Sequence, residues 1–82
     1  MKFKASVYVS LKPGYSDPEG QTTAKSLRGL GYSVSDVRVS KVYEAEMEAS
    51  GRREAEQLLD EMCRRLLSNP TKDNYRFEIR EQ

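Results

Sequence analysis

The chain has 82 residues, which is enough for one domain with a small core, and we treat residues 1–82 as that single domain. Its 14 Lys and Arg residues nearly balance its 13 Asp and Glu residues, so the net charge is only +1. This balance argues against a nucleic-acid partner, which usually needs a clearly basic face, and no apolar run approaches the ~20 residues of a membrane span.

The histidine and cysteine content narrows the chemistry further. The chain has no His, which removes the commonest general base and the commonest metal ligand. Its single cysteine, Cys63, excludes an internal disulfide, and a reducing, cytoplasmic location is the simplest interpretation.

Residues Lys2 to Leu11 form the first predicted element. Apolar residues stand at every second position from Phe3 to Leu11, with Lys, Ser and Tyr between them. This period of two predicts a strand with one buried face. The sequence Lys12-Pro13-Gly14-Tyr15 ends the strand as a turn.

A short helix is predicted to start at Asp17-Pro18-Glu19-Gly20. The carboxylate of Asp17 suits the N-cap, and Pro18 suits the first helical position, where its missing N–H is no loss. Gly31 is a natural residue just after the helix end. The expected buried stripe is narrow and consists of Ala24, Leu27 and Leu30.

The stretch from Val34 to Ala49 also has the period of a strand, with apolar residues at Val37, Val39, Tyr43, Ala45 and Met47. One strand of this length would span roughly 50 Å, whereas a compact domain of this size is about 30 Å across. We therefore predict a long strand, kinked or bulged near Ser40-Lys41, whose outer half pairs with a partner chain. A tight hairpin with a loop from Ser40 to Val42 is the alternative.

A second and stronger helix is predicted after Ser50-Gly51, ending before Pro70, and a last strand from Asn74 to Arg80. The helix stripe at i, i+3, i+4 and i+7 spacing consists of Ala55, Leu58, Leu59, Met62, Cys63, Leu66 and Leu67. This order predicts an α+β fold, β-α-β(β)-α-β: a two-layer sandwich with both helices on one face of a mostly antiparallel sheet.

The residues that could carry chemistry have simpler structural interpretations. Cys63 lies in the helix stripe. Because the chain offers no His as a basic partner for a catalytic thiolate, we interpret Cys63 as a small core residue. The carboxylates of Glu44, Glu46 and Glu48 alternate along a strand, about 7 Å apart, which is loose for one cation and favours a solvated face. We therefore predict no catalytic, cofactor-binding or metal-binding residues, and expect a small binding or assembly module.

Several segments, in order, are similar to one family. Asp17-Pro18-Glu19-Gly20 follows a strand that ends in Leu11-Lys12, and Val37-Arg38-Val39-Ser40-Lys41 corresponds to a V-R-[IV]-G-K segment. The match continues at Met62-Cys63, from Leu66 to Pro70 and from Asp73 to Ile79. Over almost its whole length the chain resembles PurS, the small subunit of phosphoribosylformylglycinamidine (FGAM) synthase. Ser40 replaces the usual Gly of the kink, and Asn74 stands where the family usually has an acidic residue.

The resemblance implies a non-catalytic role in a ligase complex of de novo purine biosynthesis. PurS-like proteins bridge a PurL-like synthetase subunit, which binds ATP and Mg²⁺, and a PurQ-like glutaminase subunit, and they assist ammonia transfer. They also form dimers or tetramers. We expect an exposed partner-docking surface at Asp17, Pro18, Glu19, Gly20, Arg38 and Lys41.

Two alternatives stay open at this point. One is an ACT-like regulatory module that binds a small ligand between subunits. The other is a homo-oligomeric interaction module, for which the long strand with Val37, Val39, Tyr43, Ala45 and Met47 would form the contact.

Overall fold

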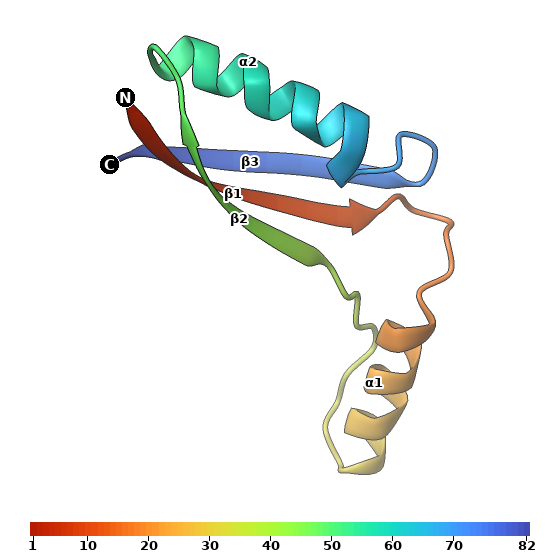
Figure 1. The fold of residues 1–82 in the computed structure, drawn as a ribbon. Coiled ribbons are helices and arrows are strands. Elements are labelled where there is room, and N and C mark those ends of the chain that lie inside the picture. The colour runs from red at the N-terminus through yellow and green to blue at the C-terminus, as the bar shows by residue number, and fades with distance from the viewer.

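The computed structural model describes residues 1–82 and contains three strands and two helices (Figure 1). A π-helical turn, η1, continues the second helix directly. The elements in order are β1 (Lys2–Leu11), α1 (Pro18–Gly29), β2 (Lys41–Glu48), α2 (Arg52–Met62), η1 (Cys63–Leu67) and β3 (Asp73–Glu81).

The three strands form one antiparallel sheet in the order β2-β1-β3. Val7 of β1 lies opposite Tyr43 of β2 and Phe77 of β3. Because directly opposed residues share a face, the apolar positions of all three strands gather on one side of the sheet. The alternation predicted for the first and last strands is confirmed.

The core lies between this apolar face and α2. Leu59 and Cys63 of α2 and η1 are fully buried, as are Phe3 and Val7 of β1. Figure 1 shows α2 running along the sheet above β1 and β3. The second predicted helix is confirmed, and so is the assignment of Cys63 to the core.

Helix α1 lies elsewhere than expected, although the α+β class and the antiparallel sheet are confirmed. Figure 1 shows α1 projecting beyond the end of the sheet instead of covering its face beside α2. The molecule consequently measures 51 × 27 × 13 Å, with a radius of gyration of 16.3 Å. A compact domain of this length would have a radius of gyration near 12 Å. The stripe of α1 is too narrow to form a core contact: Ala24 is buried, but Leu30 is 74% exposed.

Both ends of α1 form as the sequence predicts. Asp17 caps the start of the helix. At the end, Gly31 adopts φ +98°. The Tyr32 N–H donates to the Leu27 carbonyl at 3.1 Å and the Gly31 N–H to the Arg28 carbonyl at 3.0 Å. This is the Schellman arrangement, which favours glycine after the last helical turn.

The middle strand is shorter than predicted. Strand β2 begins at Lys41, at the expected break, and residues 34–40 belong to no strand. Val37 and Val39 therefore lie outside the sheet of this chain. The hairpin alternative is wrong, since β2 is a single strand paired with β1. The break has a physical cause, because the Val39 N–H bonds to the Asp17 carboxylate and is not free for a strand partner.

Candidate interaction surfaces

An apolar groove runs between β2 and the side of α2. Helix α2 and η1 cover β1 and β3 more fully than β2, so Tyr43, Ala45 and Met47 stay half-buried. The groove has a volume of about 620 Å³ and is rimmed by charged residues. Its lining consists of Tyr43, Glu44, Ala45, Met47, Glu48, Leu58, Glu61, Met62, Arg65, Leu66 and Leu67. Three of the five residues predicted for an oligomer contact are thus brought together here.

The helix side of this groove was missed by sequence reasoning. Leu58, Met62 and Leu66 were predicted to be buried, but they are 37%, 36% and 83% exposed. The helix packs on the sheet through a neighbouring row that contains Leu59 and Cys63. The sequence of α2 does contain an indication of the groove, because its apolar residues form two adjacent rows at i, i+4 spacing. Together these rows make an apolar face wider than one three-stranded sheet can cover.

The projecting arm, residues 12–40, is tied at its base by Asp17. The Oδ1 atom of Asp17 accepts the Gly20 N–H at 2.9 Å, and the Oδ2 atom accepts the Val39 N–H at 2.8 Å. The residue is only 8% exposed. The bonds from Val39 and then Gly20 hold the pKa of the Asp17 carboxyl below its usual range, because both favour the charged form.

Two further contacts close the base of the arm. Gly20 packs so tightly against the returning chain that a Cβ atom there would overlap the Val37 carbonyl oxygen. Arg38 Nη2 donates to the Leu11 carbonyl at 3.3 Å, which joins the last residue of β1 to the segment before β2. The two passes of the chain at the base of the arm, one leaving β1 and entering α1 and the other returning to β2, are therefore linked to each other.

The structure divides the predicted docking residues into two groups. Pro18, Glu19, Arg38 and Lys41 are exposed around the base of the arm. Asp17 and Gly20 are buried, in contrast to the exposed turn that was expected. Their direct contacts are within this chain.

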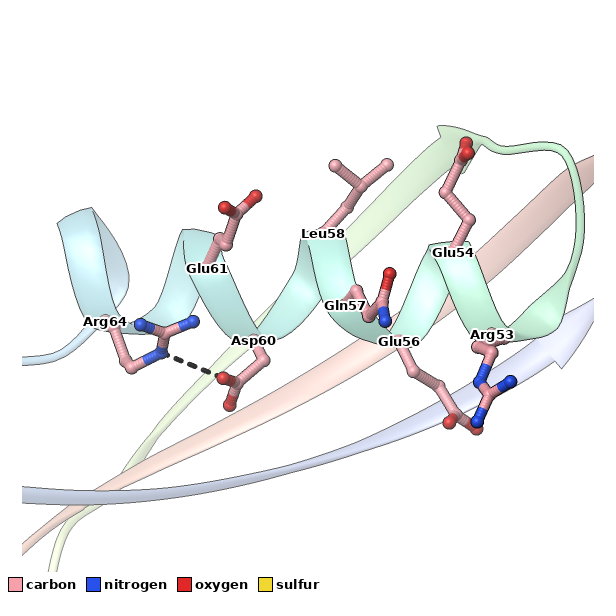
Figure 2. Close-up of a pocket in the computed structure, with 8 residues that line it drawn as sticks. All are labelled: Arg53, Glu54, Glu56, Gln57, Leu58, Asp60, Glu61 and Arg64. Carbon is pink, nitrogen blue, oxygen red and sulfur yellow. Dashed lines mark hydrogen bonds and ion pairs between the residues drawn. The ribbon is translucent and has the colours of Figure 1, made fainter.

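The outer surface of α2 is charged. Figure 2 shows Glu54, Leu58 and Glu61 projecting on one side of the helix and the Asp60–Arg64 pair on another. The Arg64 Nε atom lies 2.8 Å from Asp60 Oδ2. Ion pairs this exposed contribute little stability, so we interpret this surface as solvated.

The open face of the sheet carries the acidic row predicted on the middle strand. Glu46 lies opposite Lys4, and Glu48 lies opposite Lys2. Each of these carboxylates thus has a basic neighbour on β1. Farther along, the Arg76 guanidinium stacks on the Tyr8 ring at 4.0 Å from the centroid. This pattern agrees with a solvated, mixed-charge face.

The thiol of Cys63 is poorly suited to nucleophilic chemistry. Cys63 is fully buried, and burial, followed by the charge of Asp60, raises the pKa of its thiol. A thiol in this state supplies little thiolate. The structure contains no group of three His, Cys, Asp or Glu side chains that could hold a metal ion. No helix has the length and apolar character needed to cross a membrane.

These features define a class of protein: a small α+β module whose distinctive surfaces are an apolar groove and a projecting arm. The PurS family profile, described as phosphoribosylformylglycinamidine (FGAM) synthase, matches residues 4–81. The chain belongs to the PurS family. This membership favours the first interpretation of the sequence over an ACT-like regulatory module.

Relatives match over nearly their whole length. The chain is 46% identical to phosphoribosylformylglycinamidine synthase subunit PurS of Archaeoglobus fulgidus, covering 94% of this chain and 98% of that protein. It is 40% identical to the Bacillus subtilis subunit, covering 96% of this chain and 94% of that protein.

Solved structures agree in fold. Thermus thermophilus PurS superposes with a TM-score of 0.90 at 35% identity, covering 100% of this chain and 99% of the other. A chain in the structure of PurLQS from Thermotoga maritima superposes with a TM-score of 0.86 at 31% identity, with the same coverage. The projecting arm falls within both full-length superpositions.

Proposed function

We propose that this chain is the PurS subunit of FGAM synthase, acting in the cytoplasm in de novo purine biosynthesis. The observation that carries the proposal is the full-length match to a chain in the Thermotoga maritima PurLQS structure. In this role the chain bridges a PurL-like synthetase and a PurQ-like glutaminase, and it assists the passage of ammonia between them.

The chemistry then belongs to the partners. The synthetase binds ATP and Mg²⁺, and this chain holds no cofactor of its own. Two features support this division of labour. The one thiol, that of Cys63, is sealed in the core, and the chain has no His to act as a general base.

The base of the arm is the proposed docking surface for a partner subunit. Pro18, Glu19, Arg38 and Lys41 offer exposed groups of both charges close to the end of the sheet. Asp17 and Gly20 contribute indirectly, because they hold the exposed residues in place.

Self-association into a dimer or tetramer is the second part of the proposal. The apolar groove of β2 and α2 is open, and Leu66 on its side is 83% exposed. An open apolar surface of this kind on a small domain is typical of a protein contact. Val37 and Val39, the other two residues predicted for the oligomer contact, lie outside the sheet, and the Val39 N–H is already bonded to Asp17. We therefore place the self-contact at the groove.

Assembly can be tested with purified proteins. The chain is mixed with the PurL-like and PurQ-like subunits of the same genome, with ATP, Mg²⁺ and glutamine, and the mass of the product is measured by size exclusion with light scattering. We expect one complex that contains all three proteins. Glu19→Lys should weaken it, whereas the matched change Glu78→Lys, on the open face of β3, should not. If the three proteins elute separately at micromolar concentration, the proposal is wrong.

A further inference from the structure

We propose that Asp17, together with Gly20, locks the α1 arm at a fixed angle to the sheet, so that both are positioning residues for the arm. The lock is a property of the isolated chain. Its use rests on the proposed function, because a subunit that contacts several proteins needs its arm held in one orientation before they bind.

The geometry of Asp17 goes beyond that of a helix cap. A cap needs one acceptor for an amide of the first turn, which Oδ1 supplies to Gly20. The second oxygen accepts the Val39 N–H, which lies 22 residues farther along the chain and belongs to the pass that returns to β2. One carboxylate therefore joins the start of α1 to the strand side of the arm.

Gly20 allows these two passes to lie close together. Its φ is not positive, so backbone conformation alone does not require a glycine. The requirement is space, since a side chain would overlap the Val37 carbonyl oxygen and the Asp17 carboxylate. The absence of a Cβ at Gly20 is thus part of the same lock.

The other anchors of the arm precede Asp17: the Lys12 N–H donates to the Lys72 carbonyl at 2.7 Å, and the Tyr15 hydroxyl donates to the Thr71 carbonyl at 3.1 Å. None of its large apolar side chains is buried against the sheet: Leu30 is 74% exposed and Tyr32 is 62% exposed. Beyond those anchors, α1 is held by the two bonds of Asp17, the close approach of Gly20 and the bond from Arg38 to Leu11. Loss of the base contacts would let the arm swing without unfolding α1.

A distance measurement within one chain tests the lock. Nitroxide labels are attached at Ser26→Cys on α1 and Glu78→Cys on β3, which are both exposed positions. Labelled chains are diluted with an excess of unlabelled chains, so that each oligomer holds at most one labelled copy. The buried Cys63 should take no label, and the protein without added cysteines checks this. We expect a single, narrow distance distribution.

Two variants separate the lock from the cap. Asp17→Asn keeps a good capping residue, but its one acceptor oxygen can serve only one of the two amides. Gly20→Ala raises helix propensity while its methyl group forces the two passes apart. Both should keep the helical circular dichroism of α1 yet broaden or shift the distance distribution. Glu19→Gln, an exposed change in the same turn, is the matched control and should leave it unaltered.

Hydrogen exchange of the unmutated protein is a second test of the lock, and it does not require any variant to fold. The Val39 amide should be protected, and in Asp17→Asn it should exchange roughly tenfold faster. A rapidly exchanging Val39 amide in the unmutated protein overturns the lock, and so does an unchanged distance distribution in both variants. Neither result bears on whether the three subunits assemble, so the lock and the proposed function fail separately.

Discussion

The Tyr75 hydroxyl donates a 2.6 Å hydrogen bond to Asp60 Oδ1, which ties β3 to α2 at the side of the core. Arg64 Nε donates to the other oxygen of Asp60 at 2.8 Å. The bond from Tyr75, and then that from Arg64, lowers the pKa of Asp60. The same bond to Asp60 raises the pKa of Tyr75.

We expect Tyr75→Phe to lower the midpoint of urea denaturation. The change keeps the ring, which packs against the core, and removes only the hydroxyl that satisfies a half-buried carboxylate. Tyr32→Phe is the control, because Tyr32 is exposed at the arm tip. Equal midpoints for the two variants would show that the bond to Asp60 does not contribute to stability.

Stability should fall in acid. The pKa values of Asp17 and Asp60 are both lowered from an ordinary value of 3.8. A carboxyl whose pKa is lowered in the folded state stabilises the fold fully at pH values above its ordinary pKa. This stabilisation is lost as the pH falls through the lowered pKa. Denaturation midpoints measured from about pH 6 to about pH 2.5 should therefore decrease. The denaturation midpoint of Asp60→Asn should decrease less over this pH range. A decrease identical to that of the unmutated protein would contradict the lowered pKa of Asp60.

The two rows of α2 should respond differently to truncation. Leu59 is fully buried, so Leu59→Ala should cost about 2–5 kcal/mol of unfolding free energy. Leu66 is 83% exposed in the groove, and Leu66→Ala should change the stability of the single chain by no more than about 0.5 kcal/mol. It should instead reduce the oligomer mass found by light scattering. The reverse pattern would mean that α2 packs through the other row.

The end of α1 offers a matched pair of glycines. Gly31 has φ +98°, so Gly31→Ala should destabilise the arm by about 1 kcal/mol. Gly29 lies inside the helix with nothing near its Cβ position, so Gly29→Ala should stabilise the arm by about 0.5–1 kcal/mol. The melting temperatures of the two variants, measured by circular dichroism, should shift in opposite directions from that of the unmutated protein. A shift of the same sign in both would contradict the assigned helix end.

Local patterns account for the part of the fold that could be predicted. The alternation from Phe3 to Leu11 predicted β1, and the cap at Asp17 and the turn glycine at Gly31 predicted the ends of α1. These features depend on neighbours within a few residues. The direction of α1 depends on the bond between Asp17 and Val39, whose partners are 22 residues apart in the sequence.

The groove could be predicted only in part, for a related reason. The period of α2 shows that Leu58 and Leu59 both lie on its apolar side, but not which row meets the sheet. That choice depends on where the helix lies across three strands. A sequence pattern therefore identifies a wide apolar face, whereas the structure identifies the half that stays open.

The central claim is tested most directly by activity of the reconstituted complex. The PurL-like and PurQ-like subunits are assayed for FGAM formation with and without this chain, once with glutamine and once with a high concentration of ammonium. We expect glutamine-dependent turnover to require the chain and ammonium-dependent turnover to require it less, since diffusion then replaces delivery between subunits. Equal glutamine-dependent turnover with the chain left out would contradict the account.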